Sequence, residues 1–260
     1  MIHLRTAGEI DALEAAGAVL ARLFDAIVDR VVPGVTTAAL DRFAEDVIRS
    51  HDGAVPAFKG LYGFPATLCT SINEEVVHGI PSKRRVLEDG DIVSIDAGVR
   101  LDGWFGDRAM TYPVGDVSGE TGQLLETTRR ALAAGIATAT IGNRMGDIGA
   151  AIQKVAEDAG MSVVRELVGH GIGREPHEEP QVPNFGRAGT GLRLLAGLVI
   201  AIEPMVNRGA AGIRTLADRW TVVTADGQRS AHFEHTVAIT RAGPRILTGS
   251  SRISSGHHVA

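Results

Sequence analysis

The sequence predicts an α+β fold in which two similar halves, related by a pseudo-two-fold axis, surround a central antiparallel β-sheet. Two observations carry this prediction. Helical periodicity and β-rich alternation occupy separate stretches of the chain, and a ten-residue pattern occurs twice. From Leu87 the chain reads LEDGDIVSID, and 107 residues later, from Leu194, it reads LLAGLVIAIE. We therefore expect one domain over residues 1–260, with halves at about 7–114 and 118–247 and a flexible tail at 250–260.

The first helix is predicted to begin after Thr6, because Thr6 and Glu9 stand at the spacing of a capping box. Apolar residues then recur every three or four positions as far as Val31, and Pro33 followed by Gly34 ends the helix. Apolar periodicity predicts further helices over 37–49, about 120–140 and 145–159.

A β-hairpin is predicted where IVSIDAGVRLDGWFGDRAMTYPV surrounds an Asp102-Gly103 turn. A two-residue loop there pairs Asp96 with Ala109 and places Asp107 diagonally opposite Asp96 on the same face, with the Cα atoms roughly 7 to 8 Å apart. Later strands are predicted near 163–170, 198–206, 219–224 and 231–240, with a turn at 226–228 that joins the last two as a pair.

The segment GHGIGREPHEEP carries two histidines, His170 and His177, on a backbone rich in glycine and proline. Gly171, Gly173 and Pro176 break a helix and weaken a strand, so we predict an irregular passage from strand to loop.

Composition excludes several classes of protein. The formal net charge is −5, and the Lys and Arg residues are scattered, which predicts no nucleic-acid or membrane partner. The first residues have neither the pattern of a secretory signal nor that of a membrane span, so a cytoplasmic location is expected. The single cysteine, Cys69, forms no internal disulfide. The paired His257 and His258 of the tail are predicted to have no role.

Four acids project from these β-rich, apolar segments: Asp96, Asp107, Glu203 and Glu234. The simplest interpretation pairs each one with Lys or Arg, yet no lysine lies between Lys83 and Lys154 or beyond Lys154. Two like charges ~4 Å apart repel by about 4 kcal/mol at an effective dielectric of ~20, so four unneutralised carboxylates would protonate or unfold the site.

Divalent cations solve this charge problem. One ion leaves the four carboxylates at −2 and two ions leave them neutral, which favours a dinuclear centre with bridging carboxylates. His170 supplies a neutral nitrogen ligand, as such oxygen-rich sites often include. An HExxH zinc motif, a GxGxxG dinucleotide motif and a phosphate-binding loop are all absent from the sequence.

With these residues assembled, the chain resembles the type I methionine aminopeptidases of the pita-bread fold (peptidase family M24). Five segments follow that family in order: FPATLCTSINEEVVHGIP, DGDIVSIDAGVRLDGWFGD, GHGIGREPHEEPQV, AIEPMVN and FEHTVAIT. The resemblance implies that Asp96, Asp107, His170, Glu203 and Glu234 are the metal ligands. It makes His78, His177 and Glu203 catalytic, and it places Phe64, Cys69, His78, His177 and Trp220 around the substrate.

The implied activity is hydrolytic removal of N-terminal methionine from nascent polypeptides by a monomeric enzyme, with the ribosome as one place of action. Two divalent ions (Co, Mn, Fe or Zn) would activate water. Two alternatives stay open: a proline-directed peptidase of the same fold, and a non-catalytic binding module that has lost ligands. Four positions depart from the family's pattern: Phe105, Arg108, His232, and Pro176, which predicts a wider methionine pocket.

Overall fold

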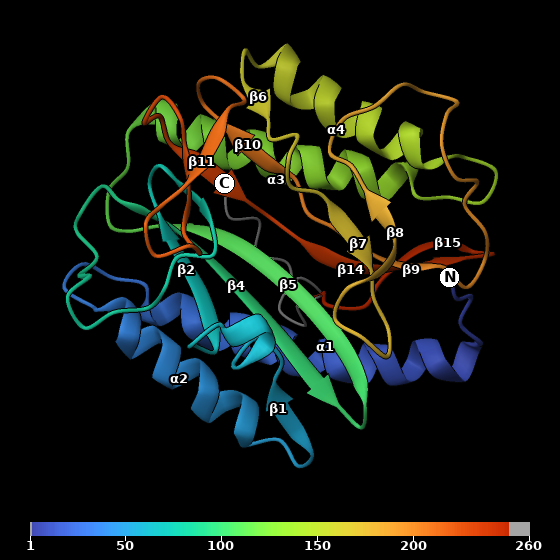
Figure 1. The fold of residues 1–260 in the computed structure, drawn as a ribbon, viewed down its shortest axis with the longest axis horizontal. Coiled ribbons are helices and arrows are strands. Elements are labelled where there is room, and N and C mark those ends of the chain that lie inside the picture. The colour runs from blue at the N-terminus through green and yellow to red at the C-terminus, as the bar shows by residue number, and fades with distance from the viewer. Residues whose placement is uncertain (1, 250–260) are drawn as a thin grey trace.

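The computed structural model describes residues 2–249 (Figure 1). The predicted tail at 250–260, with His257 and His258, lies outside them. The α-helices are α1 (Ala7–Ile27), α2 (Thr37–Arg49), α3 (Gly119–Thr138) and α4 (Met145–Asp158), with 3₁₀ turns at Val28–Arg30 and Leu61–Gly63. The strands are β1 (Ala54–Pro56), β2 (Leu68–Ile72), β3 (Glu75–Val77), β4 (Ile92–Leu101), β5 (Trp104–Pro113), β6 (Ser162–Val163), β7 (Gly169–Gly171), β8 (Glu178–Val182), β9 (Val199–Ile202), β10 (Met205–Asn207), β11 (Ile213–Thr215), β12 (Val222–Thr224), β13 (Ser230–His232), β14 (His235–Thr240) and β15 (Gly243–Ile246).

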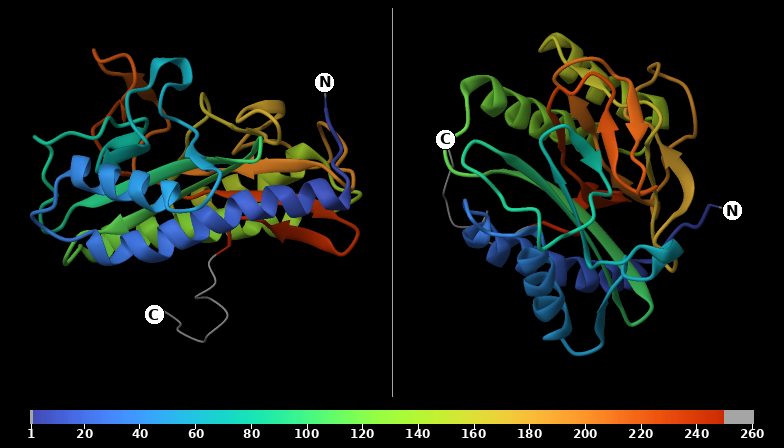
Figure 2. Two further views of the ribbon diagram at one scale, coloured as in Figure 1. Left: turned by 90° about the horizontal axis from the view of Figure 1, so that it is seen from below. Right: turned by 60° about the vertical axis from the view of Figure 1, so that its left-hand side comes forward.

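The helices confirm the predicted pattern. The capping box at the start of α1 is formed, because the Thr6 side chain accepts from the Glu9 amide and the Glu9 side chain accepts from the Thr6 amide. The apolar face of α1 packs on β4 and β5, with Leu20 and Ile27 fully buried. Figure 2 (left) shows α1 and α3 along one side of the strands, whereas the loops around β3 and β11 rise on the other side.

The predicted hairpin is confirmed in its turn and its register. Asp102 and Gly103 have φ values of 51° and 79°, the two positive values that a two-residue type I′ turn requires. Asp96 pairs with Ala109, and Asp107 pairs with Gly98. Along its other edge β4 pairs with β2 and β1, so Asp96 lies in the interior of a sheet.

The second half contains a five-stranded sheet in the order β15-β14-β9-β7-β8, and two three-stranded sheets complete the described fold, in the orders β13-β10-β6 and β11-β12-β3. Helix α3 packs against β9, β10 and β13 of this half and reaches β5 of the first. The architecture is therefore the predicted α+β class, with antiparallel pairing throughout the named strand pairs.

The two halves meet where β5 runs beside the start of β14. The Thr236 hydroxyl accepts from the Asp107 amide at 3.0 Å and donates to the Asp107 carbonyl at 2.9 Å, and the Glu234 amide donates to the Ala109 carbonyl at 2.8 Å. These bonds fix the backbones of Asp107 and Glu234 relative to each other.

Three predicted strands are wrong in extent, since each is two strands with a break. The break in 163–170 separates β6 from β7, that in 198–206 lies at Glu203-Pro204, and that in 231–240 lies at 233–234. Pro204 cannot donate to a ladder, which explains the second break. Two of the breaks therefore coincide with Glu203 and Glu234, whose side chains leave the regular alternation of the sheet.

The predicted pairing across 226–228 is also wrong. The chain turns there, but β12 pairs with β3 and β11, whereas β13 pairs with β10. The predicted irregular passage from strand to loop is confirmed, because His170 lies on β7, residues 172–177 form a loop, and β7 pairs with β8 in an irregular register. Among residues 2–249, no helix combines the length and apolar character needed to cross a membrane.

We predict that Thr236→Val destabilises the protein by about 1 to 3 kcal/mol, because a buried amide and carbonyl lose their partner at the junction of the halves. Chemical unfolding would measure the change. Thr138→Val is the matched control, since that hydroxyl bonds only to Ala134 of its own helix. Equal stability of the two variants would contradict the role assigned to Thr236.

Candidate metal centre

The predicted site residues converge on one cavity of about 300 Å³. Its walls come from both halves of the chain. They comprise the five predicted ligands together with Phe58, Leu61, Tyr62, Phe64, Cys69, Val77, His78, Leu167, Val168, His177, Met205, Trp220 and His232. All ten predicted site residues are therefore brought together, and none lies elsewhere.

The four acids reach the cavity from the strands and the strand breaks just described. Asp107 and Glu234 are buried, at 4% and 2% exposure. One ligand atom each of Asp107, His170 and Glu234 lies within 4.8 Å of the others. Asp96 and Asp107 influence each other electrostatically, since each carboxyl contributes to the pKa shift of the other.

His170 presents a lone pair to these acids. Its Nδ1 lies 3.0 Å from the Gly171 carbonyl oxygen, which can only accept, so Nδ1 carries the proton and Nε2 is free to act as a ligand. That Nε2 lies 3.5 Å from Glu203 Oε1 and 3.9 Å from Asp107 Oδ2. A side chain at Gly171 would collide with the backbone of Glu179, which explains the glycine beside the histidine.

The donor set fits a cation. Asp96 Oδ1, Asp107 Oδ1 and Glu234 Oε1 are buried and have no hydrogen-bond partner among the described residues. Burial raises the pKa of Asp96 to about 7, and burial followed by the neighbouring acids raises the pKa values of Asp107 and Glu234 well above their ordinary range. No lysine or arginine is among the cavity's described lining residues, so divalent ions are the charges that these carboxylates need.

His232 is a site residue that the sequence analysis noted only as a departure from the family. It is 1% exposed, its Nε2 has no hydrogen-bond partner in the described chain, and this atom lies 3.6 Å from Glu203 Oε2. Its backbone amide and carbonyl both bond to the Thr111 hydroxyl at 2.8 Å. The signal that could have found it is its place two residues before Glu234.

The two histidines predicted to face the substrate, His78 and His177, also line this cavity. The His177 ring lies 4.5 Å from the His170 ring, measured between centroids. Burial, followed by the neighbouring His170, lowers the pKa of His177 to about 4, and burial also lowers the pKa of His78. His177 is therefore neutral at pH 7 and can donate a hydrogen bond without carrying charge.

Apolar side chains form the other end of the cavity. Phe64 and Trp220 meet edge to face at 5.1 Å, and His78 lies 6.4 Å from Trp220. Cys69 is the sheet partner of Asp96, and burial raises the pKa of its thiol well above the ordinary value, so it stays protonated. The sequence analysis missed Phe58, Leu61, Tyr62, Val77, Leu167, Val168 and Met205, which lie on segments with no chemical motif.

Pro176 is buried and is not among the residues that line the cavity, and the wider methionine pocket stays a prediction. Tyr62 instead stands beside His177, with the two rings stacked at 6.2 Å, and Phe58 adds apolar bulk to the wall.

Known proteins resemble this chain in sequence and in fold. The model of metallopeptidase family M24 matches residues 11–241. The chain belongs to metallopeptidase family M24. It is 53% identical to a methionine aminopeptidase of Clostridium perfringens, over 95% of this chain and 99% of the relative. It superposes on the crystal structure of a methionine aminopeptidase from Thermotoga maritima with a TM-score of 0.94 and 42% identity, covering 96% of this chain and 100% of that chain.

Other peptidases share the fold of this M24 protein at greater distance. The prolidase from Pyrococcus furiosus superposes with a TM-score of 0.74 and 22% identity, and the match covers 96% of this chain but 66% of the prolidase. That likeness shows the fold alone. Membership of family M24 implies dependence on divalent metal, in agreement with the unpartnered carboxylate oxygens.

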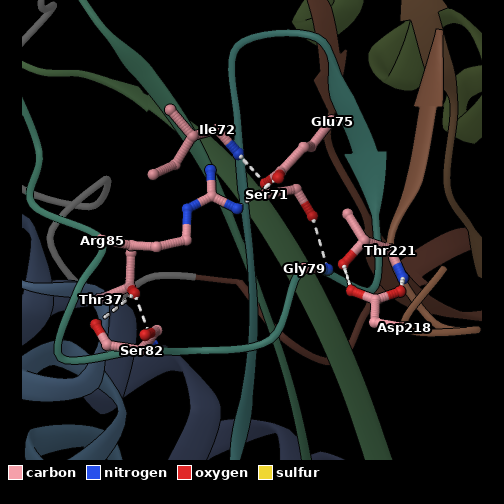
Figure 3. A network of polar contacts seen from close by, with 9 residues as sticks. All are labelled: Thr37, Ser71, Ile72, Glu75, Gly79, Ser82, Arg85, Asp218 and Thr221. Carbon is pink, nitrogen blue, oxygen red and sulfur yellow. Dashed lines mark hydrogen bonds and ion pairs between the residues drawn. The ribbon is translucent and has the colours of Figure 1, made fainter. Parts of the chain in front are cut away.

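A polar network joins residues that neighbour His78 and Trp220 in the sequence, among them Gly79 and Thr221 (Figure 3). Glu75 on β3 forms an ion pair with Arg85 and accepts from the Ile72 amide at 2.8 Å. Asp218 accepts from the Trp220 amide at 2.9 Å. Because His78 directly follows β3 and has a φ of 61°, its position depends on this bracing.

The raised carboxyl pKa of Asp96 predicts how metal binding depends on pH. Between its ordinary value of 3.8 and about 7, the folded chain keeps a proton that the unfolded chain has lost, so this group's contribution to the free energy of unfolding falls as the pH rises through that window. A bound divalent ion takes the place of this proton, so the free energy of unfolding no longer falls across that pH window.

We therefore expect Mn²⁺ to raise the melting temperature more at pH 8 than at pH 6. Differential scanning calorimetry with and without the ion would measure both shifts, with EDTA-treated protein as the baseline at each pH. A shift that is equal at the two values, or larger at pH 6, would contradict the carboxylate assignment.

Proposed function

We propose that this protein is a metal-dependent aminopeptidase that removes the N-terminal methionine of polypeptides. One observation carries the proposal: a carboxylate cluster suited to divalent ions shares its cavity with an apolar wall built by Phe64, Cys69 and Trp220. The first feature suits hydrolysis, and the second suits a long, flexible apolar side chain. The relatives named methionine aminopeptidase support it over nearly the whole chain.

The proposed centre holds two ions. Four carboxylates carry four negative charges, which two divalent cations balance, and His170 adds a neutral ligand. An oxygen-rich set of this kind suits Mn, Fe or Co better than a structural zinc site, with catalytic Zn as a further option. The proposed ligands are Asp96, Asp107, His170, Glu203 and Glu234.

The bound ions would supply a nucleophile at neutral pH, because they lower the pKa of water towards 7. Glu203 is the proposed general base, which takes a proton from the attacking water and passes it to the departing amine. Its carboxylate lies between His170 and His232, at 3.5 and 3.6 Å, so both of its oxygens face nitrogen atoms.

The two substrate-side histidines act on the carbonyl group of the first peptide bond. His177 is neutral at pH 7 and donates to the carbonyl oxygen as negative charge develops there, while His78 supports the same region from beside Trp220. Phe64, Cys69 and Trp220 hold the methionine side chain. The scissile bond thereby lies between the cluster and His177.

The proposed setting is the cytoplasm, where a monomer acts on nascent polypeptides, including those emerging from the ribosome. The one cysteine is a buried thiol, which fits a reducing compartment. Light scattering after size exclusion would test the monomer.

Hydrolysis of Met-Ala-Ser against Ala-Pro-Ala, together with metal analysis, tests the function directly. We expect release of methionine from the first peptide and no cleavage of the second. Preferential cleavage of Ala-Pro-Ala would establish the proline-directed alternative. If neither peptide is cleaved and no metal is bound, the protein is a non-catalytic binding module.

We predict that Asp107→Asn abolishes peptidase activity and weakens the binding of both ions while the fold persists. The substitution removes one charge from a buried cluster whose oxygens need cations, and it leaves the backbone bonds of Asp107 to Thr236 in place. Titration calorimetry would measure binding of the two ions, and circular dichroism would measure the fold. Wild-type activity in this variant would refute the dinuclear assignment.

We further predict that His177→Ala lowers kcat by about 10² to 10³, or about 2.7 to 4 kcal/mol, because a donor to the developing charge is lost. Metal content is expected to stay at the wild-type level, since the substrate rather than an ion is the partner proposed for His177. Loss of metal with an unchanged kcat would reverse this assignment.

A further inference from the structure

We propose that Arg5 is a positioning residue for the reaction: through Glu178 it holds the loop between β7 and β8 so that His177 faces the cavity. The inference rests on the proposed function, because it assigns a task to the N-terminal segment in that chemistry. Arg5 and His177 are far apart in the sequence, and neither the family's motifs nor the sequence analysis connects them.

His177 itself supplies little to fix its ring. The ring contacts the rings of His170 and Tyr62, and its side chain makes no hydrogen bond to another residue of the described chain. Its direction therefore depends on the backbone at 172–178. Glu178, the next residue, is the centre around which that backbone is folded.

The Glu178 carboxylate closes the loop. Its Oε1 accepts from the amides of Arg174 at 2.7 Å and Glu175 at 3.2 Å, while its Oε2 forms an ion pair with the Arg5 guanidinium. The side chains of Arg5 and Glu178 are 8% and 11% exposed, so solvent screens this pair little. One carboxylate thus joins the N-terminal segment to the loop that carries His177.

Arg5 is anchored independently of Glu178. Its amide donates to the Gly197 carbonyl at 2.7 Å, immediately before β9. Figure 1 shows the N-terminal end beside β8 and β9, in agreement with this bond. The guanidinium therefore reaches the loop from a fixed point on the second half.

The loop is shaped to receive Arg5. A Cβ atom at Gly173 would lie 2.0 Å from a guanidinium nitrogen of Arg5 and 2.8 Å from Glu178 Oε1, so a side chain there would displace this ion pair. The Gly173 carbonyl accepts from the Phe105 amide at 2.9 Å. The guanidinium carbons of Arg5 and Arg174 lie 5.4 and 3.7 Å from the centroid of the Trp104 ring, so cation–π attraction also holds both arginines at this loop.

Four variants test the inference at saturating Mn²⁺ with Met-Ala-Ser as the substrate. Arg5→Met removes the charge and keeps much of the length, Arg5→Lys keeps the charge, and Glu178→Gln keeps an acceptor for the two amides. Arg245→Met is the matched control, because it breaks an ion pair of Arg245 with Glu14 on α1, away from the loop.

We expect Arg5→Met to lower kcat by about 10- to 100-fold, the size of effect that displacement of a reacting group by ~1 Å produces, with KM and metal content unchanged within about twofold. Arg5→Lys should recover most of the rate, and Arg245→Met should match wild type. The same loss in Arg245→Met, or no loss in Arg5→Met, overturns the inference. Should Arg5→Met fail to fold, Glu178→Gln decides by the same criterion.

Hydrogen exchange separates this inference from the proposed function. Without substrate, the amides of Arg174 and Glu175 should exchange at least tenfold faster in Arg5→Met than in wild type, while those of β4 keep their rates. If wild type does not hydrolyse Met-Ala-Ser, the proposed function is wrong, but the exchange result still tests whether Arg5 and Glu178 hold the loop at 172–178. Unchanged exchange at 172–178 in Arg5→Met refutes that role of Arg5 even where activity falls.

Discussion

The constraint on which the structure depends is the gathering of four carboxylates, two buried and two partly buried, in one cavity with no lysine or arginine among its described walls. Carboxylates in such a place either protonate or bind metal, and the raised carboxyl pKa values show how strongly burial disfavours their charge. The surrounding fold makes this arrangement stable. Asp96 and Asp107 lie on one face of a hairpin whose two strands have ten residues each, and the second half closes over that face through Thr236.

Ligands and substrate groups are held by different means. Asp96, Asp107 and His170 lie on strands, where the hydrogen-bond ladder fixes the backbone. His78 and His177 lie on loops, and each has a nearby acid paired with an arginine: Glu75 with Arg85, ten residues further along the chain, and Glu178 with Arg5 of the N-terminal segment. These loops have no strand ladder to fix their backbone. Each acid also accepts from backbone amides, Glu75 from one and Glu178 from two, and these bonds supply rigidity in its place.

Short sequence motifs predicted those parts of the site whose geometry neighbouring residues determine. Asp102-Gly103 specifies a two-residue turn, and that turn alone sets the register that places Asp107 beside Asp96. The breaks at Glu203 and Glu234 were not predicted, because apolar residues stand on both sides of each break. Pro204 explains the first of these two breaks, and the second depends on the contact of the two halves at β5 and β14. His232 could have been found from its place two residues before Glu234. The contact of Arg5 with Glu178 joins residues far apart in the chain, which neither spacing nor composition reveals.

Arg108 shows how the same strand keeps opposite charges apart. It follows Asp107, yet alternation along β5 sends its guanidinium to the other face of the sheet, over the Phe24 ring of α1 at 4.7 Å. Burial lowers the pKa of this guanidinium, and the charge of Asp25 on α1 opposes that shift. A cation placed on the cavity side would compete with divalent ions for the carboxylates. On the α1 side it leaves them available, so a large charged residue next to a ligand is compatible with the metal centre.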